Sequence, residues 1–416
     1  MQALPGFRDF YPEDCARRNY IVSVWRDVAR RYGFVEFDGP TLEPLDLYAK
    51  KNSGGEILGQ LFNFTDKGDR PVALRPEMTP TLARMVATKS KDYRKPLKWF
   101  CASPFFRYEK QQKGRLREFW QFNADLIGEG GPGADAEVVA LAVDLLREFG
   151  FGKDDFVVRL SDRRAWQQFL ADRSVDPAVL PDFLSVVDKL ERDAPEAIEA
   201  RLGEMGVALA DVRAFIADGG GAAFDALFAE LDARGVREFV QPDLTIVRGL
   251  AYYTGLVFEV FDRSRKLRAL AGGGRYDRLL ADLSDGACDL PALGFGMGDV
   301  SLGNFIDEVP AAAARRDAFL RSEAGAEIVV VIAEETQRAP AIALAQSLRA
   351  AGWRTDYSLV PAKVGRQFQD AEKQGARFAV VVGSEWPVVK LKLLATRAEE
   401  SIPHDALVDR LKSHHV

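Results

Sequence analysis

The sequence predicts an α+β protein, in which an antiparallel sheet is flanked by helices, interrupted by a helical insertion and followed by a smaller α/β domain. Three observations support this expectation. Residues 1–160 contain many strand-like segments joined by loops of hairpin length, whereas residues 163–238 are rich in helical patterns. From about residue 325, strands and helices alternate regularly with glycines between them, which is typical of a small parallel or mixed α/β domain.

The first part begins with a helix over 17–32, because Ile21, Trp25 and Ala29 recur at helical spacing and Gly33 is a suitable residue to end it. Further helices are expected at 81–87 and 134–149. Strands are expected at 34–37, 61–64, 71–74, 99–108 and 117–126.

The middle of the chain reads as an insertion, because strand-like segments resume after it at 244–247, 257–261 and 293–295. Residues 315–324 form a polar, alanine-rich bridge. Beyond it the pattern predicts strands at 327–333, 354–357 and 377–382 with helices at 339–351 and 364–374. We expect a catalytic domain in two parts, residues 1–162 and 239–314. The helical insertion between them covers 163–238, and the C-terminal domain covers 325–416.

Composition excludes several kinds of site. The three cysteines, Cys15, Cys101 and Cys288, are far apart in sequence, and every histidine lies at or after His404. The main body therefore cannot hold a Ser-His-Asp triad or a Cys/His zinc site, and the cysteine usage suits a reducing compartment. Apolar runs are only of strand length and the N-terminus lacks a signal-peptide pattern, so we expect a soluble, cytoplasmic protein that does not enter a membrane. A net charge of −6 argues against general nucleic-acid binding but permits a local basic surface.

A basic hairpin carries the first chemical motif. If the strands before and after its loop pair, then Arg107, Glu109, Gln121 and Asp125 lie on one face, because side chains on a strand repeat every second residue. An arginine there could clamp a phosphate while a glutamate accepts from an exocyclic amine. The alternative is a charged hairpin with a solvated face.

Three further segments carry polar or glycine-rich patterns. Glu77 and Thr79 precede a helix and could bind an ammonium group, although Thr79 could equally be an N-cap. Arg248 is followed by Tyr252 and Tyr253, and the glycines of 272–274 would let a ligand approach the backbone; both segments could instead be a turn and an aromatic core pair. The spacing Gly294-Phe-Gly296-Met-Gly298 resembles a dinucleotide fingerprint only superficially, since no βαβ unit follows.

Taken in order, these segments resemble the histidyl-tRNA synthetases, a family of class II aminoacyl-tRNA synthetases. The resemblance covers nearly the whole chain. It is carried by Leu4-Pro-Gly-Phe-Arg-Asp, Arg75-Pro-Glu-Met-Thr, the motif 2 run at 106–128, Arg248-Gly-Leu-x-Tyr-Tyr, Gly-Gly-Arg275-Tyr-Asp and the C-terminal α/β domain.

The resemblance implies a class II synthetase-like catalytic sheet, a C-terminal anticodon-binding domain and a homodimer built partly around Gly39-Pro40. The implied reaction joins L-histidine to ATP, with Mg²⁺, and transfers the histidyl group to tRNA(His). Three residues would bind ATP, and the two arginines among them would be catalytic at the α-phosphate: Arg107, Glu109 and Arg248. Six would bind histidine, the first three at its ammonium group and the others around its imidazole: Glu77, Thr79, Gln121, Asp125, Tyr252 and Tyr253. Three in the hairpin loop would contact tRNA: Lys110, Lys113 and Arg115. No residue is assigned to the metal.

Three positions depart from the family pattern: Asp125 stands where a glutamate is common, Ala251 where an aspartate is frequent, and Ser301 where the motif 3 arginine is expected. The missing arginine leaves the γ-phosphate without an assigned partner. It also motivates a second hypothesis, a non-catalytic histidine-binding regulatory subunit of ATP phosphoribosyltransferase, which shares the catalytic fold but lacks the anticodon-binding domain. A third hypothesis is a tRNA-binding module without catalysis.

Overall fold

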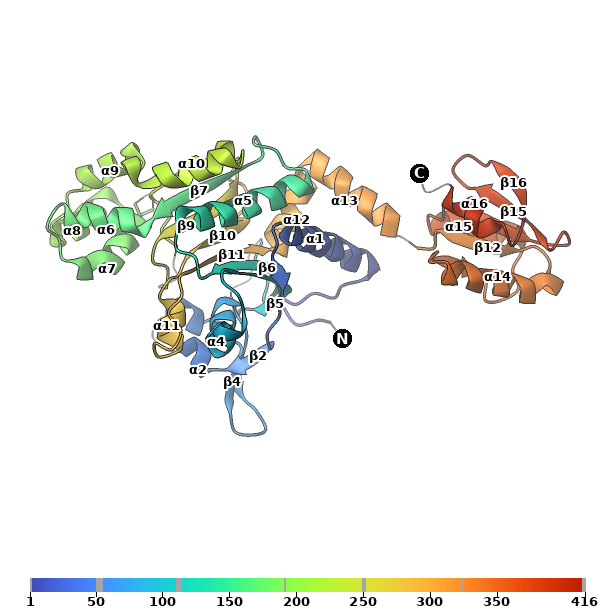
Figure 1. Ribbon diagram of the computed structural model, residues 1–416, viewed down its shortest axis with the longest axis horizontal. Coiled ribbons are helices and arrows are strands. Elements are labelled where there is room, and N and C mark those ends of the chain that lie inside the picture. Colours follow the sequence, from blue (N-terminus) through green and yellow to red (C-terminus); the bar gives the residue numbers. More distant parts are fainter. Residues whose placement is uncertain are drawn as a thin grey trace. The chain divides into compact units, whose positions relative to one another are not determined.

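The structure is a computed structural model that describes residues 2–49, 55–109, 114–190, 192–248, 252–323 and 325–413. The chain divides into two compact units, Met1–Arg316 and Asp317–Val416 (Figure 1). Within the described residues, we find no helix that is both long and apolar enough to span a bilayer.

An eight-stranded sheet forms the centre of the larger unit, in the order β1-β5-β6-β11-β10-β9-β7-β8. Its strands are β1 (Val35–Glu36), β5 (Leu97–Phe106), β6 (Glu118–Ile127), β7 (Phe156–Asp162), β8 (Val240–Pro242), β9 (Leu256–Asp262), β10 (Ala271–Arg275) and β11 (Ala292–Gly298). Neighbours from β5 to β7 are antiparallel, as the α+β prediction requires, while β1 and β8 add parallel edges.

Three helices cover one face of this sheet: α1 (Pro12–Arg31), α5 (Pro132–Phe149) and α12 (Asp299–Glu308). Trp25 of α1 is fully buried against Phe122 of β6, with ring centroids 5.9 Å apart. Because successive side chains on a strand point to opposite faces, Gln121, Asn123 and Asp125 lie on the other face. That second face holds the polar residues singled out in the sequence.

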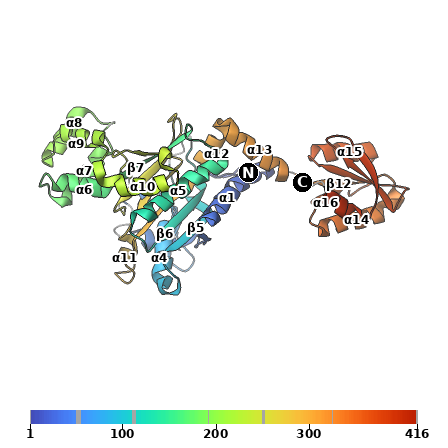
Figure 2. The ribbon, with the colours of Figure 1, turned by 45° about the horizontal axis from the view of Figure 1, so that its top comes forward.

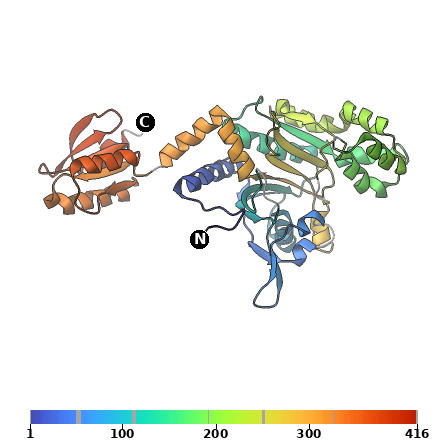
Figure 3. The same ribbon diagram turned by 180° about the vertical axis from the view of Figure 1, so that it is seen from behind.

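On the second face, α4 (Thr79–Lys89) packs against α11 (Leu279–Leu283). Beside them lies a three-stranded sheet, β2 (Leu42–Pro44), β4 (Pro71–Leu74) and β3 (Asn63–Thr65), with the short helices α2 (Asp46–Ala49), α3 (Gly55–Leu58) and η1 (Ser90–Asp92). The loop that joins β3 to β4 extends away from the body of the unit (Figure 1, Figure 3).

The segment between β7 and β8 is helical, and its helices α6 to α9 gather beside β7 (Figure 2). Its elements are α6 (Arg163–Ala171), η2 (Pro177–Val179), α7 (Leu180–Val187), α8 (Pro195–Glu204), α9 (Leu209–Asp218), η3 (Gly221–Phe224), α10 (Asp225–Ala233) and η4 (Arg237–Phe239). The strand expected at 244–247 is wrong. Asp243 Oδ1 accepts from Thr245 N at 3.1 Å, and Trp166 Nε1 donates to Leu244 O at 3.1 Å, so one local and one distant side chain bind backbone groups that a strand would pair.

The expected bridge at 315–324 is helical over its described residues, where α13 spans Pro310–Glu323. Alanine and arginine favour a helix, and proline is tolerated in the first turn, which explains its start.

In the smaller unit, five strands follow the order β13-β12-β14-β15-β16. The elements are β12 (Ile328–Ile332), η5 (Glu335–Gln337), α14 (Arg338–Ala350), β13 (Thr355–Tyr357), α15 (Val364–Lys373), β14 (Phe378–Val382), β15 (Val388–Leu393), β16 (Glu399–Pro403) and α16 (Leu407–Lys412). β12 runs parallel to β13 and β14, and the rest of the sheet is antiparallel. One apolar cluster joins α14 and α16 to one face, and another joins α15 to the opposite face. The expected α/β alternation is confirmed, and the β15–β16 hairpin extends it.

Candidate functional site

Two cavities meet on the second face of the large sheet. The smaller, of about 50 Å³, is enclosed by polar side chains, and the larger, of about 490 Å³, opens to the surface. They share five lining residues: Arg107, Gln121, Arg248, Gly272 and Gly296. All six residues expected to bind histidine line the small cavity, and all three expected to bind ATP line the large one. Two other cavities, of about 370 and 420 Å³, contain none of these side chains.

Glycines on β10 and β11 make room for the side chains of the site. A Cβ atom on Gly294 would lie 2.0 Å from Asp125 Oδ1, and one on Gly296 would lie 1.9 Å from Gln121 Nε2. On Gly272 it would lie 1.5 Å from Arg248 Nη1. The glycines therefore let the protein's own side chains lie across neighbouring strands, in addition to any approach by a ligand.

Asp125 is buried on β6 at the floor of the small cavity. The Tyr276 hydroxyl donates to its Oδ1 at 2.5 Å. Burial raises the pKa of Asp125 to about 7; the Tyr276 hydrogen bond opposes this shift, and the nearby Glu77 carboxyl adds to it. The carboxyl group is consequently poised to exchange a proton near neutral pH and to accept from a heteroaromatic N–H once it is ionised.

Glu77 precedes α4 and is the second buried carboxyl of the small cavity. Its Oε2 accepts from the Tyr252 hydroxyl at 2.9 Å. Burial raises the pKa of Glu77, against the lowering effects of Arg107, the Tyr252 hydrogen bond and Arg248. Among the described residues, Glu77 Oε1 and Gln121 Oε1 are buried without a hydrogen-bond partner. Two unsatisfied acceptors in one small cavity favour a ligand with several donors, such as an ammonium group.

Thr79 is the first residue of α4 and lines the small cavity near Tyr252. The N-cap of α4 is Met78, which provides no side-chain hydrogen bond. The alternative that Thr79 caps the helix is therefore wrong. The Thr79 side chain also hydrogen-bonds the Tyr252 phenol and so works against the rise in its pKa that burial causes.

Arg107 stands at the junction of the two cavities, immediately after β5. Its Nε donates to Pro76 O at 2.9 Å, and its guanidinium lies 5.4 Å from the centroid of the Phe119 ring. A backbone bond from Arg107 N to Arg117 O, 2.9 Å long, fixes the start of the hairpin loop. These contacts hold the cation in place before a ligand arrives.

Arg248 reaches the same junction from the other side. Its backbone has a φ of 55°, and its Nη1 donates to Glu259 Oε1 at 3.1 Å. Arg163 supports this segment, with Nη1 donating to Tyr253 O at 2.6 Å and Nη2 to Arg248 O at 3.3 Å. The Arg248 Nε is buried without a partner among the described residues, so a phosphate oxygen could satisfy it.

Glu109 and Arg115 form an ion pair in the larger cavity. Arg115, one of the three residues expected to contact tRNA, is thus held at the cavity, and its side chain is 46% exposed. Lys110 and Lys113, the other two residues expected to contact tRNA, lie outside the described residues, as does Ala251.

Sequence reasoning missed four residues that build or support the site: Asn123, Tyr276, Glu259 and Arg163. Asn123 lies between Gln121 and Asp125 in the same two-residue repeat, so strand periodicity alone could have found it. Tyr276 belongs to the Gly-Gly-Arg275-Tyr-Asp motif, but nothing in the sequence indicates that it contacts Asp125. Glu259 and Arg163 carried no local signal.

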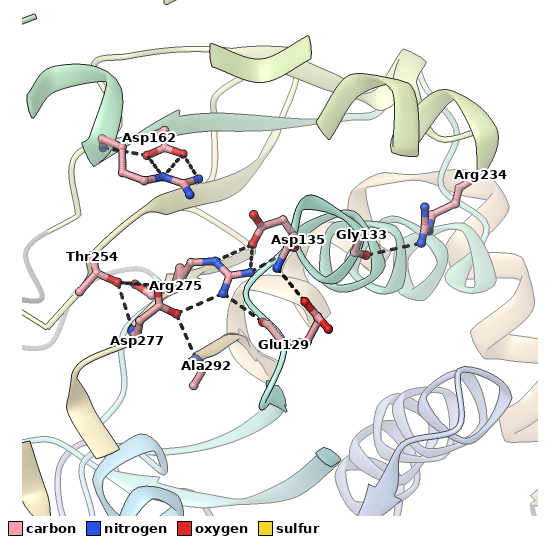
Figure 4. A network of polar contacts seen from close by, with 11 residues as sticks. Glu129, Gly133, Asp135, Asp162, Arg234, Thr254, Arg275, Asp277 and Ala292 are labelled. Atoms are coloured by element: carbon pink, nitrogen blue, oxygen red, sulfur yellow. Dashed lines mark hydrogen bonds and ion pairs between the residues drawn. The ribbon is translucent and has the colours of Figure 1, made fainter. Parts of the chain in front are cut away.

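Arg275, from the same motif, is a structural residue (Figure 4). It is 1% exposed, and its Nη2 lies 2.6 Å from Asp135 Oδ1 at the start of α5. Its Nη1 donates to Asp277 Oδ1 at 3.1 Å and to Glu129 O at 3.2 Å. The network joins β10 to the N-terminus of α5 and so fixes β10, the strand that carries Gly272.

Two family models and several known proteins match this chain. The family model for histidyl-tRNA synthetase matches residues 6–299, and the anticodon binding domain model matches residues 327–414. The histidine–tRNA ligase of Opitutus terrae is 44% identical, with 97% of this chain and 96% of the relative aligned. The crystal structure of histidyl-tRNA synthetase from Nostoc sp. PCC 7120 shares the fold, at a TM-score of 0.78, 22% identity and 99% coverage of both chains. A Bacillus halodurans structure described as an ATP phosphoribosyltransferase regulatory subunit/histidyl-tRNA synthetase has a TM-score of 0.70 and 25% identity, covering 91% of this chain and 97% of that one. By the extent and identity of these matches, the chain belongs to the histidyl-tRNA synthetase family of aminoacyl-tRNA synthetases.

Proposed function

We propose that the protein activates L-histidine with ATP to form histidyl-adenylate, and then transfers the histidyl group to the 3′ end of tRNA(His). One observation carries the proposal: a small cavity with two buried carboxyl groups adjoins a larger cavity, and Arg107 and Arg248 line both. An amino acid in the first cavity would present its carboxylate to a phosphate held at that junction.

The small cavity suits histidine at both ends. Glu77 and Gln121 supply acceptor oxygens for the ammonium group, with Thr79 beside them. Asp125 accepts from one imidazole nitrogen, and the phenol of Tyr253 serves the other, next to Tyr252. A side chain without both nitrogens would leave buried polar groups unpaired, which discriminates strongly against it.

The activation step needs no protein base, because the attacking carboxylate is already ionised. A carboxylate oxygen forms a bond to the α-phosphorus, and the bond from that phosphorus to the bridging oxygen breaks, releasing pyrophosphate with the electron pair. Charge develops on the phosphate oxygens, where Arg107 and Arg248 stabilise it. Glu109 serves the adenine in this scheme.

A divalent cation fits the same cavity. Mg²⁺ is usually held by one or two carboxylates together with substrate phosphates. Glu259, which lines the larger cavity beside Arg248, would hold it with the phosphates. When bound, the ion neutralises phosphate charge and stabilises the leaving pyrophosphate.

The remaining assignments concern the domains, the contacts with tRNA, the oligomeric state and the compartment. We assign residues 1–162 and 239–314 to catalysis, 163–238 to an insertion and 325–416 to anticodon binding, with Lys110, Lys113 and Arg115 contacting tRNA. The protein acts as a homodimer, in line with the edge strand β1, where Val35 is 63% exposed. It works in the cytoplasm, consistent with free Cys15, Cys101 and Cys288.

The decisive experiment is histidine-dependent exchange of labelled pyrophosphate into ATP. We expect exchange with histidine and none with other amino acids, because only histidine satisfies the small cavity. Histidine binding without exchange, by pure and folded protein, would instead support the regulatory-subunit hypothesis. Binding of tRNA without either would support the non-catalytic module.

Replacing Asp125 by asparagine should lower kcat/KM for histidine on the order of 100-fold, because a neutral amide replaces the carboxylate acceptor. In the unchanged protein, kcat/KM should rise with pH through about 7, as the carboxyl loses its proton and becomes an acceptor. The asparagine variant should lose that rise and keep only the titrations of Glu77 and of histidine itself. Asp289→Asn, at an exposed carboxylate, is the matched control. An unchanged pH profile in Asp125→Asn would show that another group reads the imidazole.

A further inference from the structure

The larger cavity carries more positive charge than the α-phosphate alone requires. Among its described lining residues are two glutamates and four arginines: Glu109, Glu259, Arg107, Arg115, Arg248 and Arg268. Arg115 pairs with Glu109, and Arg248 pairs with Glu259. Counted over the described lining residues, four arginines and two glutamates give a formal excess of two positive charges, which suits a polyanion longer than one phosphate.

Arg268 lies at the part of the rim where Ser301 stands. A Cβ atom on Gly114 would lie 3.7 Å from Ser301 Oγ and 4.0 Å from Arg268 Cδ, so both side chains approach the same point. Both line the larger cavity and neither lines the smaller one. Ser301 carries no charge, whereas Arg268, from the connection between β9 and β10, is a cation that lines the same cavity.

The backbone before Arg268 is held firmly. Asp262, at the end of β9, is 1% exposed, and its Oδ2 accepts from Ser264 Oγ at 2.5 Å and from Lys266 N at 3.0 Å. Its Oδ1 accepts from Leu267 N at 3.1 Å. These bonds fix the turn immediately ahead of Arg268, so its long side chain starts from a fixed base, and the residue as a whole is exposed.

We propose that Arg268 is a nucleotide-binding residue that contacts the β- and γ-phosphates of ATP and supplies the cation that position 301 lacks. The inference rests on the proposed function, since it takes ATP as the occupant of the larger cavity. With the α-phosphate at Arg107 and Arg248, the phosphate tail extends from the junction toward Arg268. As the bond between the α-phosphorus and the bridging oxygen breaks, Arg268 stabilises the charge that passes to pyrophosphate.

The test compares ATP with AMP, which lacks the two outer phosphates. Arg268→Ala should weaken ATP binding, and raise KM for ATP in exchange, by about 10-fold or more, because a charge-assisted bond to phosphate is lost. Its affinity for AMP and for histidine should stay close to that of the unchanged protein. Lys266→Ala, at an exposed residue of the same connection, is the matched control. Arg268→Lys should retain part of the effect, and Arg268→Ala combined with Ser301→Arg should recover ATP binding.

Two results would overturn the inference. An equal loss of ATP and AMP affinity would place Arg268 at the nucleoside, and no change in either affinity would remove it from the nucleotide. Failure of the proposed function looks different: the unchanged protein would show no histidine-dependent exchange, yet the ratio of ATP to AMP affinity would still decide the role of Arg268. Loss of folding is recognised by an altered thermal midpoint and by loss of histidine binding.

Discussion

Arg248→Ala should reduce kcat for histidine-dependent pyrophosphate exchange by about 100- to 1000-fold, the range seen when one preorganised donor to a developing oxyanion is removed. Arg248 stands where both cavities meet, opposite Arg107, and its guanidinium is already oriented by Glu259. In the proposed reaction, its charge acts most strongly on the α-phosphate while the bond to pyrophosphate breaks. Steady-state exchange gives kcat, and calorimetry gives the histidine dissociation constant, which should change little.

The backbone of Arg248 requires a specific control. Its φ of 55° is unfavourable for alanine, so part of any loss could come from strain. Arg248→Gly accepts this conformation and should lose the same turnover. Arg263→Ala, at an exposed residue whose Nε donates to Lys153 O, should retain activity. If the glycine variant were fully active, the charge of Arg248 would have no part in the chemical step.

Arg275→Met should lower the free energy of unfolding of the larger unit by about 3–5 kcal/mol, the usual loss when one partner of a buried ion pair is removed. The substitution leaves Asp135 as a buried carboxylate without its cation and frees Asp277. Urea denaturation measures the change, and hydrogen–deuterium exchange assigns it to the larger unit.

The surface pair formed by Arg278 and Asp289 provides the comparison. Both side chains are well exposed and lie 3.7 Å apart, so Arg278→Ala should cost no more than about 1 kcal/mol. Adding Asp135→Ala to Arg275→Met should restore part of the stability, because no buried charge is then left alone. Equal effects of Arg275→Met and Arg278→Ala would show that the network in Figure 4 contributes no more than a solvated pair.

The parts of the fold and site that local patterns encode could be predicted. The β5–β6 hairpin places Gln121 and Asp125 on one face because strand periodicity is a local property. Long-range contacts left no such trace: Tyr252 meets Glu77 across 175 positions of sequence, and Tyr276 meets Asp125 across 151. The residue roles came from resemblance, and the structure adds the distances and the burial.

The strand expected at 244–247 is wrong for a related reason, because the contacts that prevent it are not part of the local apolar pattern. Residues 244–247 have the apolar content of a strand, but Asp243 and Trp166 bind the local backbone groups. The bridge at 315–324 is helical over its described residues, because helix propensity does not depend on an apolar face. Arg268 carried no signal because its importance depends on the neighbouring Ser301, which follows 33 positions later.

Gly272, Gly294 and Gly296 make room for side chains from neighbouring segments, so mutations at these glycines can change the selectivity of the site during evolution. A single methyl group at position 272, 294 or 296 would displace the side chain of Arg248, Asp125 or Gln121, respectively, and all three of these side chains line the small cavity. The shape of the small cavity therefore depends on the absence of a side chain at these three positions. Substitutions of these three glycines should therefore alter which amino acid is accepted, even though every polar side chain of the proposed site is kept.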